Sequence, residues 1–478
     1  MSSILVCHSY FLRFDQKQVE RAKPYPPLAT MQVASMLRKA GHEVSLFDAM
    51  LAEDLSRFER QLDVLKPQIV LFYEDNYNFL SKMCLGRMRV AATGMIGLAR
   101  ERRTRILAGG SDASDAPEHY LRAGADAVLH GEALGTLMAL IDRLNGDQFL
   151  PAGALASGLA DVSVLVDGVA TRQTAAARLP EPGFAALAAW DLIDIEKYRR
   201  VWRRAHGYFS LNMAASRGCS FRCNWCAKPI WGNQYLQRPA REVAAEMIHL
   251  RRHYRPDHIW FADDIFGFRA DWLHEFAAAL REEGGGVPFT IQLRADLASE
   301  RMSVALHDAG CREVWIGAES GSQKVLDAMN KGTQVAEIHQ ARQRLGAVGI
   351  RVGYFLQLGY LGEELEDLLA TRRLVEESRP DDVGVSVSYP LPGTRFYEAV
   401  KSQLGEKRHW NESNDLDMMF AGTYRSDFYR AIRNLLHDEV KQPASPEVTR
   451  RWSELIAQEY EFRQVREDGL REPAAACN

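Results

Sequence analysis

Short apolar runs with β-type patterning alternate with longer stretches of helical periodicity in two parts of this chain of 478 residues. Alternation of this kind is typical of α/β folds built on parallel sheets. The expected strands of the first part are residues 3–7, 43–48, 68–73, 105–108 and 127–129. Those of the second part are residues 209–214, 258–262, 289–293, 313–316, 352–358 and 383–387.

A chain of this length is expected to form two or three domains. We predict that residues 1–150 form a doubly wound, Rossmann-like domain, with its ligand at the carboxyl ends of the strands. Residues 205–400 are predicted to form a partial barrel of six βα units, whose chemistry also belongs at the carboxyl ends of the strands. A linker and lead-in is expected at residues 151–204, with a small hairpin at 162–171 and a Pro- and Gly-containing linker at 180–183. A helical extension is expected at residues 401–478.

The composition indicates a globular protein without a nucleic-acid or membrane partner. The formal net charge of −4 is small, so no polyanionic partner is expected. The N-terminal sequence lacks the basic start and apolar core of a signal peptide, and no apolar run is long enough to span a membrane. Seven cysteines, three of them clustered, are typical of a reducing compartment and of a cofactor site. We therefore expect a cytoplasmic protein.

Three cysteines follow the first expected strand of the barrel. Cys219, Cys223 and Cys226 have the spacing C-x3-C-x2-C. Cysteine thiolates hold iron–sulfur clusters, and a cubane takes four ligands, so this loop would leave one iron open. The alternative is a zinc site, because catalytic zinc also keeps an open position. No second C-x2-C or histidine pair follows, and the next cysteine is the distant Cys311, so the spacing favours the cluster.

The spacing, with the aromatic Trp225 just before the third cysteine, resembles the signature of the radical S-adenosylmethionine (SAM) enzymes. The resemblance implies a [4Fe–4S] cluster on the three cysteines, with SAM chelating the open iron. It also implies that the reduced cluster cleaves SAM and releases a 5'-deoxyadenosyl radical. The SAM-binding residues that it implies are Trp225, Ala262, Asp263, Asp264, Arg294, Glu319, Ser320 and Gly359.

Most of these residues end expected strands of the barrel. In the family, the segment matching Ala262 to Asp264 meets the SAM amino group, although one of the two acids could equally serve as a cap. Arg294 would clamp the SAM carboxylate, because a planar guanidinium suits a carboxylate. Glu319 could accept hydrogen bonds from the ribose hydroxyls, and Gly359 belongs to the segment that packs on adenine.

Residues 1–150 contain neither a G-x-G-x-x-G nor a G-x4-G-K-[ST] motif, which argues against NAD and nucleoside triphosphates. The arrangement instead resembles the cobalamin (B12)-binding domain in front of many radical SAM enzymes. Glycines at strand ends would let the backbone approach a large corrinoid. The D-x-H-x-x-G motif that supplies a histidine to cobalt is absent, so a domain that keeps the fold without the cofactor is the alternative. The cobalamin-binding residues that the resemblance implies are Pro26, Leu28, Gly109, Gly110, Ser111, Gly131 and Glu132.

Together the resemblances imply a cobalamin-dependent radical SAM enzyme, and our first hypothesis is methylation of an unactivated carbon in a small-molecule substrate. A second SAM would recharge methylcobalamin, and an external low-potential donor would supply electrons. The second hypothesis is a cyclising, rearranging or oxidative reaction without methylation. A methylthiotransferase would need three further N-terminal cysteines, where only Cys7 and Cys84 occur. A non-enzymatic corrinoid or zinc regulator is the fourth hypothesis. No catalytic acid or base can be named from the sequence.

Overall fold

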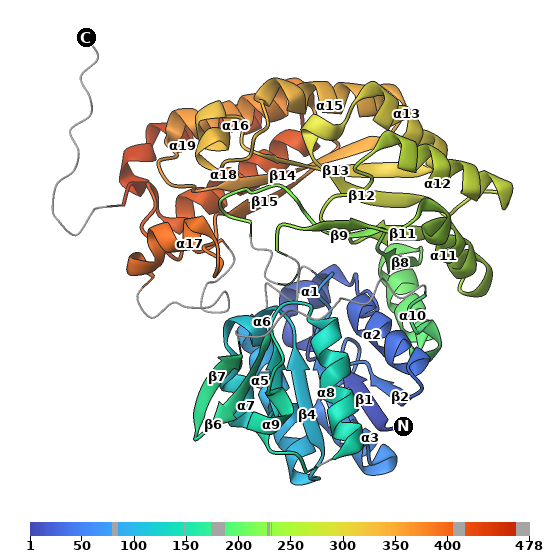
Figure 1. Cartoon of the computed structure of the whole chain (residues 1–478). Coiled ribbons are helices and arrows are strands. Elements are labelled where there is room, and N and C mark those ends of the chain that lie inside the picture. Colours follow the sequence, from blue (N-terminus) through green and yellow to red (C-terminus); the bar gives the residue numbers. More distant parts are fainter. Residues whose placement is uncertain are drawn as a thin grey trace. The chain divides into compact units, whose positions relative to one another are not determined.

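The computed structural model describes residues 1–78, 85–147, 149–173, 187–226, 230, 232–404 and 416–464. Figure 1 labels its helices and strands. The predicted linker at residues 180–183, and Cys84, lie outside the described residues. The chain divides into two compact units. The first comprises Met1–Ser220, Lys228–Gly267 and Asp271–Phe289, and the second comprises Phe221–Ala227, Phe268–Ala270 and Thr290–Asn478. None of the helices in the described ranges is long and apolar enough to cross a membrane.

The first unit contains a seven-stranded sheet with the strand order β2-β1-β3-β4-β5-β6-β7. The pairs from β2 to β5 are parallel, whereas β6 pairs antiparallel with both β5 and β7. The parallel part confirms the predicted doubly wound α/β fold. The strands are β1 (Ser3–Cys7), β2 (Glu43–Phe47), β3 (Ile69–Tyr73), β4 (Arg105–Gly109), β5 (Ala127–Leu129), β6 (Val162–Val166) and β7 (Val169–Gln173).

The predicted hairpin is present, but it extends this sheet instead of standing apart in a connector. Asp167 and Gly168 join β6 to β7 with φ values of +50° and +78°. This left-handed geometry is what an Asp-Gly pair favours in a two-residue turn. Val162 and Val164 are fully buried. The turn could be recognised in the sequence, whereas the pairing of β6 with β5 could not, because it is set by contacts distant in sequence.

The strand order fixes where a ligand can bind in this sheet. β3 is buried along its whole length, as expected for a central strand with both faces covered. β2 lies on one side of β1 and β3 on the other, so the loops after β1 and β3 diverge at a topological switch point. The helices of this region are α1 (Gln16–Arg21), α2 (Leu28–Lys39), α3 (Leu55–Leu65), α5 (Leu85–Glu101), α6 (Ser111–Asp115), α7 (Pro117–Ala123), α8 (Leu134–Gly146), α9 (Ala152–Ala156) and α10 (Ile195–His206).

The six predicted barrel strands form one sheet in chain order, β15-β14-β13-β12-β11-β8. The pairs β8–β11, β13–β14 and β14–β15 are parallel. This sheet confirms the predicted series of six βα units. Its strands are β8 (Ser210–Met213), β11 (His258–Phe261), β12 (Phe289–Leu293), β13 (Cys311–Glu319), β14 (Arg351–Leu358) and β15 (Asp382–Val387).

Capping residues mark the ends of the helices between these strands. For example, the Ser299 side chain accepts the Met302 N–H at the start of α13, and Gly310, with φ +95°, ends that helix. These helices are α11 (Ala240–His253), α12 (Ala270–Glu282), α13 (Glu300–Ala309), α14 (Gln323–Ala328), α15 (Val335–Ala347), α16 (Leu365–Ser378) and α17 (Arg395–Val400).

One face of the β13–β14–β15 sheet carries aromatic rings laid over glycines. The rings of Trp315 and Phe355 stack with centroids 4.8 Å apart. A Cβ on Gly353 would lie 2.7 Å from the Trp315 ring, and one on Gly384 would lie 3.2 Å from the Phe355 ring. Glycine is therefore required at these strand positions so that the two rings can lie across the sheet.

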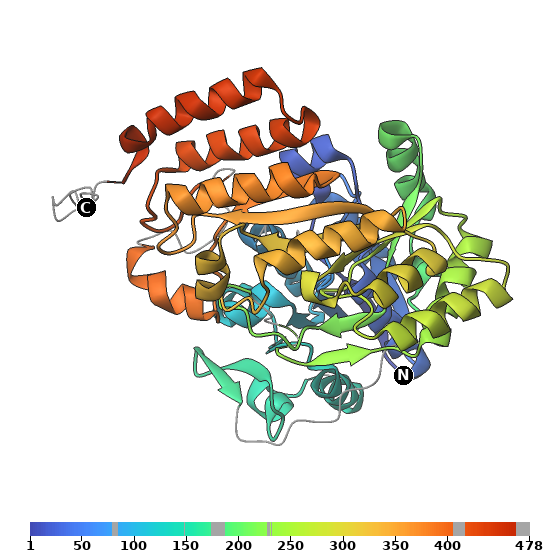
Figure 2. The same cartoon turned by 90° about the horizontal axis from the view of Figure 1, so that it is seen from above.

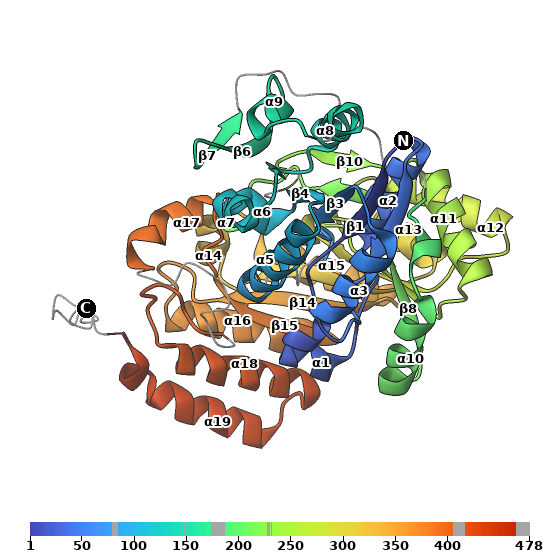
Figure 3. The same ribbon diagram turned by 90° about the horizontal axis from the view of Figure 1, so that it is seen from below.

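The predicted C-terminal extension is helical, as expected. Helices α18 (Ser426–Lys441) and α19 (Pro446–Ala457) pack side by side, and α18 also contacts β15 and α16. Figures 2 and 3 show the two helices, in red, running next to each other. The extension therefore covers the last strand of the sheet.

Candidate functional site

The three cysteines lie on the connection between two short strands that the sequence analysis did not foresee. Strands β9 (Ser216–Gly218) and β10 (Tyr235–Gln237) pair antiparallel, and Gly218, with φ +77°, directly precedes Cys219. Cys219 is buried, whereas Cys223 and Cys226 are half-buried. The β9–β10 pair therefore fixes both ends of the loop that carries the thiols.

The middle of this loop is held by contacts that use no cysteine. The Asn224 N–H donates to Met329 O at 2.8 Å, and its Nδ2 donates to Ala328 O at 2.9 Å. The Asn330 side chain donates to Arg222 O at 2.9 Å, and the Phe396 N–H donates to Asn224 O at 3.1 Å. The turn after α14 is therefore the support of the cysteine loop.

Asp263, at the end of β11, anchors the chain that leads into the loop. Its carboxylate accepts the Ala215 N–H at 3.0 Å and the Ser216 hydroxyl at 2.5 Å. Burial raises the pKa of Asp263 to about 7. The neighbouring Ala262 is half-buried and Asp264 is exposed. Of the predicted segment, Asp263 thus has a structural role toward β9, whereas the Ala262 backbone and Asp264 are more open.

Glu319, the last residue of β13, faces a buried cation that the sequence analysis missed. Lys331 Nζ lies 2.7 Å from Glu319 Oε1, and both side chains are nearly inaccessible to solvent. A Cβ on Gly317 would lie 2.8 Å from each of these charged groups, so the pair depends on the glycine. Glu319 also has a φ of +60°, in the left-handed region that residues other than glycine seldom adopt.

Ser320 and Gly321 dock the end of β13 onto α16. The Ser320 hydroxyl lies 3.1 Å from Thr371 Oγ1, which also accepts the Gly321 N–H at 2.9 Å. The Ser322 hydroxyl donates to Asp367 at 2.6 Å. The buried Ser320 therefore helps to place Glu319.

Gly359, after β14, lies in a tight turn closed by an acid. Its N–H donates to Glu363 Oε2, and its φ is +74°. A Cβ on Gly359 would lie 2.9 Å from the Met418 side chain. Glu363 is fully buried, and burial raises its pKa to about 8. The carboxyl group of Glu363 is therefore neutral near pH 7.

This neutral carboxyl makes stability depend on pH. The native state keeps a proton on Glu363 that the unfolded chain releases above its ordinary pKa of 4.5, so stability falls as pH rises from about 4.5 to about 8. Glu363→Gln is expected to remove this pH dependence. The free energy of unfolding of the variant, relative to that of the wild type, should therefore rise with pH by at most ~1.4 kcal/mol per pH unit. Urea unfolding across this pH range checks it. As a control, Glu366→Gln at an exposed neighbour should show the same pH dependence of stability as the wild type. If the stability difference between Glu363→Gln and the wild type does not change with pH, Glu363 is ionised in the folded protein.

Two buried polar atoms at the ends of the neighbouring strands β14 and β15 have no hydrogen-bond partner among the described residues. They are Gln357 Oε1 on β14 and Ser388 Oγ just after β15. Buried polar groups are normally hydrogen-bonded, so these two atoms at the carboxyl ends of barrel strands are candidate contacts for a polar ligand.

Five of the seven predicted cobalamin residues lie at the carboxyl ends of β4 and β5, namely Gly109, Gly110, Ser111, Gly131 and Glu132. Gly110 has a φ of +144°, and a Cβ there would lie 2.7 Å from the Glu74 side chain. Ser111 begins α6, and the Gly131 N–H donates to Ser114 Oγ at 3.0 Å, which ties the two loops together. Gly109, at the end of β4, is packed against Leu129.

Pro26, Leu28 and Glu132 have contacts of their own. Leu28 is fully buried at the start of α2, and Pro26 O accepts the Asn212 side chain at 3.0 Å. Glu132 forms an ion pair with Arg217 of β9. The loop after β5 is thereby joined to the strand that leads into the cysteine loop.

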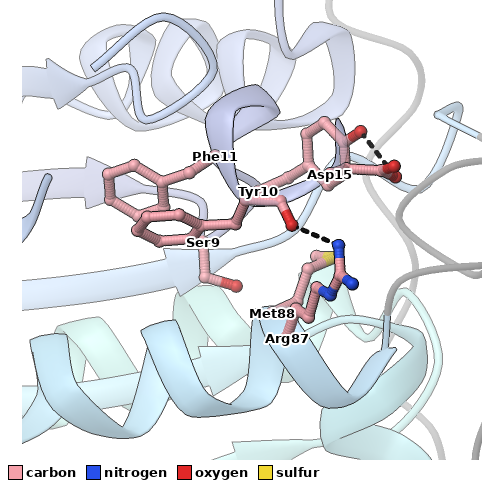
Figure 4. A pocket seen from close by; sticks show the side chains of 7 residues that line it. Ser9, Tyr10, Phe11, Asp15, Arg87 and Met88 are labelled. Carbon is pink, nitrogen blue, oxygen red and sulfur yellow. Dashed lines mark hydrogen bonds between the residues drawn. The ribbon is translucent and has the colours of Figure 1, made fainter. Parts of the chain in front are cut away.

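A small pocket lies where β1 ends (Figure 4). Its lining comes from the segment after β1 and from the start of α5. Among its lining residues, Tyr10 OH donates to Asp15 at 3.4 Å, and Arg87 donates to Phe14 O. None of the predicted cobalamin residues lines it.

Comparison with known proteins identifies both parts of the chain. The family model of the radical SAM superfamily matches residues 213–375, and that of the B12 binding domain matches residues 19–141. The chain is a radical SAM protein with a B12-binding domain. Its cofactors are a [4Fe–4S] cluster, SAM and cobalamin.

Several relatives match over most of their length. An uncharacterized methyltransferase of Pyrococcus horikoshii is 24% identical, with 82% of each chain covered. The hopanoid C-3 methylase of Methylococcus capsulatus is 26% identical over 79% of this chain and 69% of its own. The anaerobic magnesium-protoporphyrin IX monomethyl ester cyclase of Rubrivivax gelatinosus is 23% identical over 81% and 68%.

Solved structures share the fold of this radical SAM protein. The radical SAM methyltransferase TsrM from Kitasatospora setae, with cobalamin and a [4Fe–4S] cluster bound, superposes with a TM-score of 0.67 at 18% identity, covering 86% of this chain and 76% of its own. The cobalamin-dependent radical SAM enzyme OxsB gives 0.66 at 18% identity, covering 96% and 71%.

The residues of the radical SAM domain fit the cluster and SAM. Three cysteines on one supported loop could supply three thiolates to a cubane, which would leave the fourth position to a non-protein ligand. Among the described residues, no three Cys, His, Asp or Glu side chains are arranged to hold a single metal ion. A cubane spreads its ligands over several irons, so it does not require the thiols to converge on one point. The orphaned Gln357 and Ser388 atoms fit the polar groups of SAM.

The B12-binding domain fits a corrinoid. Gly110 lies so close to the Glu74 side chain that no other residue has room there. A glycine at this strand end is what the predicted backbone approach to a corrinoid requires. Pro26, Gly109, Ser111, Gly131 and Glu132 remain predicted contacts.

Proposed function

We propose that this protein is a cobalamin-dependent radical SAM C-methyltransferase that acts on a small molecule. The observation that carries the proposal is the supported three-cysteine loop of a radical SAM domain in a chain that also has a B12-binding domain. The cofactors supply the chemistry, namely a 5'-deoxyadenosyl radical from SAM and a methyl group carried by cobalamin. Relatives described as methyltransferases and a methylase support the methylating outcome.

The residues of the chain hold and orient these groups. Cys219, Cys223 and Cys226 ligate the cluster, and Trp225 lies beside the last of them. The Ala262 backbone, Asp264, Glu319 and Gly359 line the SAM site at the strand ends, in the order that the barrel dictates. Ser320 acts indirectly, by placing Glu319 through Thr371.

The setting of the protein follows from the cofactors. A reducible cluster needs an external low-potential electron donor, and a reducing compartment such as the cytoplasm suits the clustered thiols. The small net charge gives no support for a nucleic-acid substrate. The domain limits that we propose are 1–150, 151–204, 205–400 and 401–478.

A second candidate is a cyclase or another radical reaction without methylation. The magnesium-protoporphyrin ester cyclase among the relatives favours it. A methylthiotransferase is less well supported, because Cys7 is buried within β1 and burial raises its pKa well above the usual range. Such a thiol is poorly suited to ligate a second cluster.

The test uses protein purified without oxygen, loaded with iron and sulfide, and incubated with SAM, a strong reductant and hydroxocobalamin. We expect deoxyadenosine, S-adenosylhomocysteine and one bound corrinoid per chain. Cys223→Ala should abolish deoxyadenosine, whereas the matched control Cys311→Ala, at a buried thiol of β13, should retain it.

The outcomes separate the candidates. Deoxyadenosine and bound corrinoid without S-adenosylhomocysteine would favour the cyclase-type reaction. Deoxyadenosine without bound corrinoid would overturn the methylcobalamin mechanism. Neither product from folded, iron-loaded protein would overturn the radical SAM assignment of the loop.

A further inference from the structure

Arg294 is a buried cation whose contacts differ from those of a SAM clamp. It follows β12 and is only 5% exposed. Its Nε donates to Asp296 Oδ1 at 2.9 Å, and its Nη2 donates to Asp296 Oδ2 at 3.0 Å. This is the bidentate geometry that makes an arginine–carboxylate pair strong and directional. The guanidinium plane is therefore fixed by its own strand end.

The far end of the guanidinium is fixed by the turn that supports the cysteine loop. Nη2 also donates to Lys331 O at 2.8 Å and to Thr333 Oγ1 at 2.9 Å. The same turn carries Asn330, which holds Arg222 of the loop. Arg294 thus holds the turn by hydrogen bonds, and the turn holds the cysteine loop in the same way.

The remaining face and nitrogen of Arg294 meet the cysteine loop itself. The guanidinium carbon lies 3.7 Å from the centre of the Phe221 ring, within the range of a cation–π contact. Nη1 lies 3.9 Å from Cys223 Sγ and is placed to donate to it. Asp296, Lys331 and Thr333 accept the hydrogen bonds of Nε and Nη2. The ring face and Nη1 of the guanidinium therefore contact the cysteine loop.

We propose that Arg294 is a positioning residue that orders the cysteine loop and makes the cluster easier to reduce, instead of gripping the SAM carboxylate. Arginine stays charged in proteins, and donors to a ligating sulfur draw negative charge away from the cluster. Added negative charge on reduction is therefore stabilised. This inference rests on the cluster of the proposed function.

The experiment compares Arg294→Gln and Arg294→Lys with Arg344→Gln, a matched loss of an exposed arginine on α15. Cluster reduction is followed by EPR during a redox titration, and iron retention and SAM affinity are measured on the same samples. For Arg294→Gln we expect a tenfold shift of the reduction equilibrium toward the oxidised cluster, which is 59 mV for one electron. Iron should also be lost more quickly, while SAM affinity should stay within about twofold. Lysine should restore part of the shift, and Arg344→Gln should change none of the three.

The opposite pattern would overturn the inference. A tenfold loss of SAM affinity with an unchanged reduction midpoint would make Arg294 the SAM clamp. If Arg294→Gln does not fold, Phe221→Leu replaces it: faster iron loss with a near-native midpoint supports the loop-ordering role, and native iron retention refutes it. A wild-type protein that forms no cluster would instead refute the proposed function.

Discussion

Gly321→Ala is expected to destabilise the protein by about 3 kcal/mol, the upper range for overpacking. A Cβ at this position would lie 2.2 Å from Ala370 O and 2.7 Å from the Thr371 Cα, both in the backbone of α16. A helix backbone cannot move aside as a flexible side chain can, so the turn after β13 must shift. Glu319 would shift with it, and SAM binding should weaken as well. Urea unfolding and a SAM titration of the cluster-loaded variant measure the two effects.

The control for this substitution is Gly97→Ala in the interior of α5. Nothing lies within 4 Å of a Cβ at Gly97. Alanine there should therefore be neutral or stabilising by up to ~1 kcal/mol, through helix propensity alone. If Gly321→Ala unfolds at the same urea concentration as the wild type, the close packing of the β13 turn on α16 is wrong.

Glu246→Ala is expected to cost ~3–5 kcal/mol, because it strands a buried cation. Glu246 on α11 and Arg238 are both almost fully buried and form an ion pair. Arg238 also donates to Ala214 O at 2.9 Å, next to the segment that Asp263 holds. Loss of Glu246 should thus lower the urea midpoint. It should also loosen the segment at Ala214 that precedes the cysteine loop, and faster loss of iron from the loaded protein would show this.

The matched double variant Arg238→Met/Glu246→Leu separates charge from packing. Removing both charges with similar volume is often neutral or stabilising, so the double variant should regain most of the lost stability. If the double variant is no more stable than Glu246→Ala, the cost arises from packing and from the Ala214 contact, and the buried charge is not its cause.

Local pattern was enough to predict most elements of the fold. β1, β5 and β12 begin and end at the predicted residues, because their apolar runs are encoded within the segments themselves. β13 is longer than predicted. It begins at Cys311 and ends at Glu319, which pairs with Leu356 of β14 after a register shift that follows Gly317. The addition of β6 to the N-terminal sheet and the β9–β10 pair were missed, because strand pairing depends on residues far apart in sequence.

In the site, the sequence identified residue types but not the residues that they contact. The spacing of Cys219, Cys223 and Cys226 could be recognised in the sequence alone. That Lys331 faces Glu319, or that Asp263 holds Ser216, depends on packing between elements and has no local signal. Arg294 illustrates the limit most clearly: its place at a strand end was predictable, but the Cys223 and Phe221 contacts that define our proposal for it were not.

The hydrogen bonds that hold the cysteine loop at Asn224, Asn330 and Phe396 bear on how the protein recovers from exposure to oxygen. These contacts are amide and carbonyl hydrogen bonds, which exposure to oxygen does not break. A molecule that has lost its cluster to air would keep these contacts. Once its thiols are reduced again, it could therefore take up new iron and sulfide without refolding of the loop.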